Sequence, residues 1–184
     1  SELEDVKRKV KRLIEDIERA LTEANKEDEK SIEETERLNR TVHEESKELV
    51  ERLKDELRKR STDKKVVEKV KKKLDDVLRR SKEVSERSKK ILKDSVRRSA
   101  KVAEELKRRI DKLVEDAEKV IRDLNTEDVD EALKEVRDRA KKLKDKIKKV
   151  LDDNRRTVED NERKSDELLK TDKELVREVK ERTE

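Results

Sequence analysis

Serine, histidine and aspartate are the residue types in this chain whose placement suggests chemistry. Serines recur at helical spacing between Ser81 and Ser99, His43 is the single imidazole, and Asp28 lies on an otherwise apolar stripe. A Ser-His-Asp triad also needs an oxyanion hole and a cleft, and uninterrupted helices offer no free backbone N–H for one. A metal site would need further histidine or cysteine ligands, which the sequence lacks. We therefore predict no enzyme, no metal site and no cofactor.

The composition of the chain excludes several other function classes. Of its 184 residues 59% are charged and 28% are hydrophobic, and Gly, Pro, Cys, Met, Phe, Tyr and Trp are all absent. Thiol chemistry and aromatic stacking platforms are therefore excluded. Nucleic-acid binding is disfavoured because the basic face of the second helix is offset by its neighbours and no aromatic or Gly-rich element can engage bases. No apolar run is long enough for a signal peptide or a membrane span. We expect a soluble protein with no natural localisation, cytoplasmic when expressed recombinantly, and no membrane or nucleic-acid partner.

Apolar residues recur at steps of three and four, which is typical of helices that bury a seam of heptad positions. Helix-breaking positions occur only near 61–62 and 125–126, so we expect helices over about 2–60, 63–124 and 127–183. Ser1 with Glu4 is predicted to cap the start of the first helix, and Thr62 or Asp63 the start of the second. Asn125 is predicted to end the second helix, and Thr126 to cap the start of the third. Such short loops predict an all-α, up-down-up three-helix bundle of antiparallel helices, about 60 residues each, forming one elongated domain of residues 1–184 with left-handed coiled-coil packing.

The seams of the second and third helices can be read from the same spacing. The second is predicted to bury Val102, Leu106, Ile110, Leu113, Ala117 and Val120, and the third Asn161, Ser165, Leu168, Leu175 and Val179. Residues 62–124 hold 22 basic and 14 acidic side chains, a net charge of +8, so the second helix is the basic one. Opposite charge on its neighbours favours the intended pairing of helices.

Polar seam positions on the three helices fall into common layers. If each loop acts as a mirror, facing residue numbers add to about 123 for the first two helices and about 249 for the second and third. Asp28, Ser95 and Asn154 then share one layer, and Thr35, Ser88 and Asn161 share another. The predicted buried polar network comprises Asp28, Ser31, Thr35, Asn39, Ser85, Ser88, Ser95, Asn154, Thr157, Asn161 and Ser165.

Two interpretations of this polar zone are open. Buried polar groups must hydrogen-bond, and sliding a helix by one heptad would place Asn154 or Asn161 against leucines, so the zone could specify register. Alternatively it could form a polar cavity or groove that receives a ligand or a fourth helix. Asp28 could pair with Asn154 and Ser95 or lean into solvent, and His43 could join the network or lie at the surface.

The chain resembles de novo designed helical bundles with buried hydrogen-bond networks. The resemblance rests on uninterrupted helices, capping residues in place of Gly and Pro loops, Leu/Ile/Val layers, and inserted Ser/Thr/Asn layers. It implies a hyperstable scaffold or assembly module with no enzymatic role. As a scaffold, we expect a monomer that needs no partner and has no natural activity. An alternative is the three-helix part of a designed heteromer or switch, which would bind a separate helix through a second set of apolar positions: Ile14, Leu21, Ile32, Val50, Leu57, Leu78, Leu92, Val114, Leu151, Val158, Leu169 and Val176.

Overall fold

Three long α-helices make up nearly all of the protein. The computed structural model describes residues 1–124 and 127–184, and in them α1 spans Glu2–Lys59, α2 spans Lys64–Leu124 and α3 spans Val129–Glu181. These bounds differ from the predicted ones by at most two residues. The described residues contain no strand, so the predicted all-α fold is confirmed. The expected caps at Asn125 and Thr126 lie outside the described residues.

Side-chain caps begin α1 and α2 at the predicted positions. The Ser1 hydroxyl accepts a hydrogen bond from the Glu4 backbone N–H at 3.3 Å. The Asp63 carboxylate accepts one from the Lys65 backbone N–H at 3.0 Å. Each cap satisfies an amide that the first helical turn leaves without an intrahelical acceptor. The starts of α1 and α2 are thus capped by polar side chains, in a sequence without Gly or Pro.

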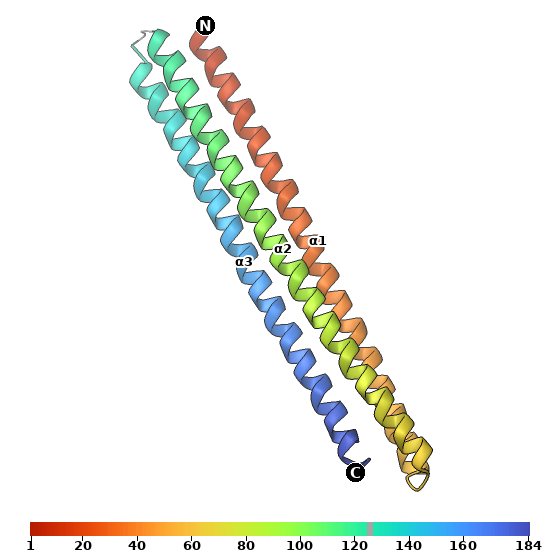
Figure 1. Ribbon diagram of the computed structural model, residues 1–184. Helices are drawn as coiled ribbons and strands as arrows, with labels where there is room; N and C mark the ends of the chain where they lie inside the picture. The colour runs from red at the N-terminus through yellow and green to blue at the C-terminus, as the bar shows by residue number, and fades with distance from the viewer. Residues whose placement is uncertain (125–126) are drawn as a thin grey trace. The chain divides into compact units, whose positions relative to one another are not determined.

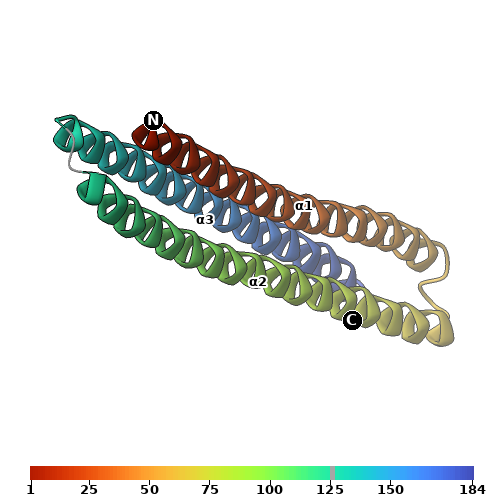
Figure 2. The same cartoon turned by 90° about the horizontal axis from the view of Figure 1, so that it is seen from above.

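The chain divides into two compact units, and each contains a segment of all three helices. Unit 1 comprises Ser1–Glu29 and Ser95–Arg156, and unit 2 comprises Lys30–Asp94 and Thr157–Glu184. Within each unit the α2 segment runs antiparallel to the α1 and α3 segments (Figures 1 and 2). The up-down-up three-helix bundle is confirmed, whereas the organisation of residues 1–184 as one domain stays a prediction.

Aliphatic side chains form the core of each unit. In unit 2 one cluster joins all three helices and includes Val50, Leu53, Val70, Leu74 and Val176. Unit 1 holds two clusters, one around Ile17, Ile110 and Ile147 and the other around Val10, Ile121 and Val136. Burial of such side chains is the main favourable term for a fold in which every helix exposes charge on its other faces.

The predicted seam of α2 is wrong at three places. It began at Val67, which is half-buried, while its neighbour Val66 is buried. Val120 is 46% exposed, while its neighbour Ile121 is fully buried. Val102 is only half-buried, and Ala103 takes the inward position. At each of these places two adjacent positions are apolar, and residue spacing alone does not choose between them.

Removing the cap of α2 should destabilise the protein. We expect Asp63→Ala to lower the free energy of unfolding by about 0.5–2 kcal/mol, because the Lys65 amide loses its acceptor. Asp76→Ala is the matched control, since Asp76 is an exposed aspartate inside the same helix, and its effect should stay within about 0.5 kcal/mol. Urea unfolding followed by circular dichroism measures both. Equal effects would show that the cap contributes nothing beyond its charge.

Truncating a core side chain of unit 2 should have a larger effect. Leu74 is fully buried among the aliphatic residues of all three helices. Leu74→Ala removes its transfer free energy and leaves a cavity, so the free energy of unfolding should fall by about 2–5 kcal/mol. Val120→Ala, at an exposed position of the same helix, should cost well under about 1 kcal/mol on the same denaturation assay. A small loss for Leu74→Ala would contradict the packing described above.

Candidate functional site

Buried polar side chains interrupt the aliphatic core. Those with little exposure are Asp28, Thr35, Ser46, Ser81, Ser85, Ser88, Ser95, Asn154, Asn161, Ser165 and Asp172. Among the described residues, every buried side-chain nitrogen and oxygen has a hydrogen-bond partner. An unsatisfied buried polar group costs about 1–3 kcal/mol, so this pairing is what makes such a core tolerable. The result is a buried hydrogen-bond network rich in serine and asparagine.

The first cluster, which we name the Asp28 cluster, lies in unit 1 and comprises Asp28, Ser95, Ser99 and Asn154. Ser95 Oγ donates to Asp28 Oδ1 at 2.8 Å, and Ser99 Oγ donates to Asp28 Oδ2. Asn154 Nδ2 donates to Ser99 Oγ at 3.1 Å. Asp28 is only 5% exposed, so it pairs in the core and does not lean into solvent. Its link to Asn154 runs through Ser99, a residue absent from the predicted network.

The second cluster, the Asn39 cluster, lies in unit 2 and comprises Asn39, Ser85, Ser88 and Ser165. The amide oxygen of Asn39 accepts from Ser88 Oγ at 3.1 Å and from Ser165 Oγ at 3.4 Å. Ser165 Oγ also lies 3.3 Å from Ser85 Oγ. The half-buried amide of Asn39 on α1 therefore accepts hydrogen bonds from serine hydroxyls of both α2 and α3.

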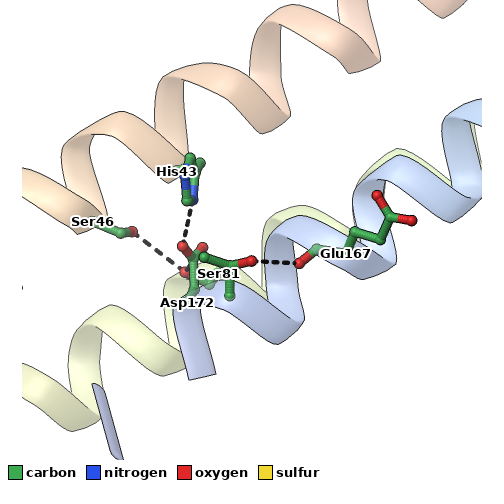
Figure 3. Close-up of polar contacts among 6 residues, drawn as sticks. His43, Ser46, Ser81, Glu167 and Asp172 are labelled. Carbon is green, nitrogen blue, oxygen red and sulfur yellow. Dashed lines mark hydrogen bonds and ion pairs between the residues drawn. The ribbon is translucent and has the colours of Figure 1, made fainter. Parts of the chain in front are cut away.

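The third cluster, the Asp172 cluster, also lies in unit 2 and comprises Asp172, His43, Ser81 and Ser46 (Figure 3). His43 Nδ1 and Asp172 Oδ1 are 2.6 Å apart, and Ser81 Oγ donates to Asp172 Oδ2 at 2.9 Å. Ser46 Oγ lies 3.3 Å from Ser81 Oγ. The carboxylate is 3% exposed. Asp172 of α3 therefore links to α1 through His43 and to α2 through Ser81, so that His43 is part of the network.

Four predicted network residues are placed differently from the prediction. Thr35 is fully buried and donates to the Ile32 backbone carbonyl at 2.8 Å, and Asn161 donates to the Thr157 carbonyl at 2.9 Å. These bonds lie within one helix. Ser31 is half-buried, and Thr157 is exposed because its neighbour Val158 takes the inward position. The expectation that Thr157 is buried is therefore wrong.

The register of the hydrogen bonds follows the predicted mirror rule closely. The residue numbers of hydrogen-bond partners on α1 and α2 add to 123 for Asp28–Ser95. They add to 127 for the other three bonds, Asp28–Ser99, Asn39–Ser88 and Ser46–Ser81. Those on α2 and α3 add to 250 or 253, for Ser85–Ser165, Ser81–Asp172 and Ser99–Asn154. A difference of four is one helical turn, which side chains on adjacent turns span easily.

Sequence reasoning missed Asp172, although a signal was present. The predicted seam of α3 steps from Leu168 to Leu175, a gap of seven that leaves out the position at which a heptad seam places a residue. Asp172 occupies that position. Its partner His43, 129 residues earlier in the chain, could be identified only from three-dimensional structure.

Ion pairs between helices surround the polar core. In unit 2, α2 supplies the cation in two pairs, Arg80 with Glu45 at 2.7 Å and Lys89 with Asp166 at 2.6 Å, and the carboxylate in a third, Asp75 with Lys180. In unit 1, Glu118 of α2 accepts from Arg137 of α3 at 2.6 Å. That hydrogen bond lowers the pKa of Glu118 below its ordinary value, against the opposing effect of burial. At pH values above the range in which carboxyl groups ordinarily titrate, the pair therefore stabilises unit 1. This stabilisation is lost as the pH falls through the lowered pKa of Glu118.

Other kinds of site are poorly supported in the described part of the chain. Residues 1–124 and 127–184 contain no group of three or more His, Cys, Asp or Glu side chains arranged to hold a metal ion. None of the helices described there is long and apolar enough to cross a membrane. A cavity of about 20 Å3 lies beside Asp28, Ser99 and Asn154. That volume suits about one water molecule and is far below that of a typical ligand pocket.

Comparison with known proteins supports the fold. No protein family and no curated protein matches the sequence. Among solved structures, a computationally designed three-helix bundle matches 99% of this chain and 86% of its own chain, with a TM-score of 0.51 and 18% sequence identity. A likeness at this identity concerns architecture alone. The chain is a three-helix bundle with a buried Ser/Asn hydrogen-bond network, similar in fold to a computationally designed protein.

Proposed function

We propose that the chain is a designed structural scaffold, a monomeric three-helix bundle without enzymatic activity whose buried polar network specifies register. The observation that carries this proposal is that three polar clusters connect the helices within their own units through side-chain hydrogen bonds. The cavity beside the Asp28 cluster has a volume of only about 20 Å3. Their arrangement suits the alignment of helices better than the capture of a ligand.

Register specificity follows from the cost of separating these partners. A helix displaced by one heptad keeps aliphatic layers in contact, because the hydrophobic repeat is the same along the chain. The same displacement removes Ser88 and Ser165 from the Asn39 amide that they share. Each buried group left without a partner costs about 1–3 kcal/mol, so several losses together disfavour the displaced state.

The burial of the second apolar set supports a monomer over a partner-binding module. Seven of its members are buried, namely Leu21, Ile32, Val50, Leu57, Leu92, Val158 and Val176. The other five, Ile14, Leu78, Val114, Leu151 and Leu169, are half-buried. A groove for a separate helix would leave a continuous apolar strip of several hundred Å2 exposed. In the described residues the large apolar side chain that is clearly exposed is Val120.

The mass of the protein in solution tests the monomer. The chain has a mass of 22.0 kDa. Sedimentation equilibrium over a wide concentration range should give that mass throughout, because the apolar faces are already covered. A mass that is a clean multiple of 22.0 kDa would overturn the monomeric scaffold and favour the partner-binding alternative, with the groove of about 260 Å3 that includes Val120 as the first region to examine.

Replacing polar core residues by aliphatic ones tests register specificity. In Ser88→Val with Asn161→Leu, thermal stability should rise or change little, because a buried polar group exchanged for a packed apolar one is often neutral or stabilising. The variant should nevertheless populate oligomers or alternative registers, visible as additional species by size-exclusion chromatography and as extra NMR signals.

The control for this variant replaces polar residues at the surface. Thr22 and Thr171 are exposed, and each hydroxyl donates to a carbonyl of its own helix. Thr22→Val with Thr171→Val adds apolar groups without touching the clusters, so a single species should persist. If the core variant unfolds without forming any new species, the register account is wrong.

A further inference from the structure

Asp172 differs chemically from the other buried polar residues of unit 2. Serine, threonine and asparagine can donate a hydrogen bond to a carbonyl of their own helix, as Thr35 does to Ile32 and Asn161 does to Thr157. A carboxylate only accepts, and the backbone N–H groups inside a helix are already used. Asp172 must therefore find its donors on other helices.

Both oxygens of Asp172 have such donors. Oδ1 faces His43 of α1 at 2.6 Å and Oδ2 accepts from Ser81 of α2 at 2.9 Å. Because a carboxylate accepts, Nδ1 of His43 carries the proton in this contact. In Figure 3 the side chains of His43 and Ser81 converge on Asp172, whereas the carboxylate of Glu167 points away from it.

We propose that Asp172 is the specificity-determining residue of unit 2, selecting the alignment of α3 with α1 and α2 through His43 and Ser81. The inference rests on the proposed register function and deepens it by assigning the selectivity to one side chain. Serine and asparagine layers tolerate displacement better, because their side chains can turn back to their own helix. The buried carboxylate has no such alternative.

Displacing α3 by one heptad toward the turn between α1 and α2 penalises Asp172. The carboxylate would then lie beside Val50 and Leu74, which are nearly or fully buried in the aliphatic cluster. A carboxylate without donors in such a place is strongly unfavourable. Displacement in the other direction would bring Asp172 to the native place of Ser165, beside Ser85 and Asn39, which can donate to it, so Asp172 disfavours the first displacement only.

Three cations of unit 2 are held in ion pairs between helices. Arg80, adjacent to Ser81, binds Glu45 at 2.7 Å. Lys89 of α2 binds Asp166 at 2.6 Å, and Lys180 of α3 is paired with Asp75 of α2. A displaced Asp172 would gain one of these three cations only by disrupting its ion pair.

Disulfide cross-linking can measure the alignment directly, because the chain has no cysteine of its own. Ser85→Cys with Ser165→Cys reports the native alignment, since the two Oγ atoms are 3.3 Å apart. Ser85→Cys with Val158→Cys reports the alignment displaced by one heptad. In the native state position 158 lies about 10 Å from position 165 along the axis of α3. It is therefore too far from position 85 for a disulfide. A glutathione redox buffer keeps both reporters at equilibrium.

We expect Asp172→Leu to raise the displaced cross-link about tenfold or more over the otherwise unchanged chain, while the denaturation midpoint stays the same or rises. Asp160→Leu is the matched control, because it removes the same charge from an exposed position of α3 that pairs only within its own helix. It should leave both reporters unchanged. A displaced cross-link no greater in Asp172→Leu than in Asp160→Leu would overturn the inference.

A second variant covers the case in which Asp172→Leu fails to fold. Asp172→Asn keeps the size of the side chain but gives it an N–H donor, which can turn to a carbonyl of α3. It should raise the displaced cross-link to an intermediate level, and the 15N NMR signal of His43 Nδ1 should shift, because that nitrogen loses its carboxylate acceptor. If Asp172→Asn leaves both the cross-link and the imidazole spectrum unchanged, Asp172 does not select the alignment.

The same reporters separate this inference from the proposed function. If Ser88→Val with Asn161→Leu raises the displaced cross-link and Asp172→Leu does not, the register function stands and the assignment to Asp172 falls. If neither variant raises it, both fall. A rise with Asp172→Leu, whether or not the other variant shows one, supports the assignment.

Discussion

The fold depends on keeping every buried polar side chain hydrogen-bonded inside a core that is otherwise Leu, Ile, Val and Ala. Aliphatic layers of one size and shape would hold the helices together, but they distinguish poorly between alignments that differ by whole heptads. The polar clusters add that distinction because their hydrogen bonds are directional and are lost on displacement. Stability and uniqueness therefore come from different residues: Leu74 and Ile110 for the first, and Asp28, Asn39 and Asp172 for the second.

The regularity of the sequence explains why most of the fold was predictable. The helix bounds followed from the caps at Ser1 and Asp63 and from the uninterrupted apolar period between them. The α2 seam failed at Val120 because Val120 and Ile121 are both apolar and residue spacing alone does not choose between two adjacent positions. The same limitation placed Thr157 in the core instead of Val158.

The candidate site was predictable in its location but only partly in its bonding. Layers inferred from loop register brought Asp28 to Ser95, and the structure places those two side chains 2.8 Å apart. Which hydroxyl serves which acceptor depends on rotamers, and a seam alone does not contain that information. Thr35 donates its hydroxyl to the backbone carbonyl of Ile32, and Asp172 contacts the imidazole of His43, which is distant in sequence. Contacts of this kind follow from the three-dimensional arrangement of side chains, which residue spacing constrains without determining.

The division of every helix between two units has a consequence for how the protein reaches its structure. In unit 2 the turn between α1 and α2 closes a hairpin whose Ser46–Ser81 contact spans 35 residues, whereas the His43–Asp172 contact spans 129. Unit 1 has the opposite layout, since its hairpin joins α2 to α3. Contacts close in sequence form sooner because their loops lose less entropy on closing. Each hairpin can therefore form early at its own turn, and the remaining helix segment, α3 in unit 2 and α1 in unit 1, joins last.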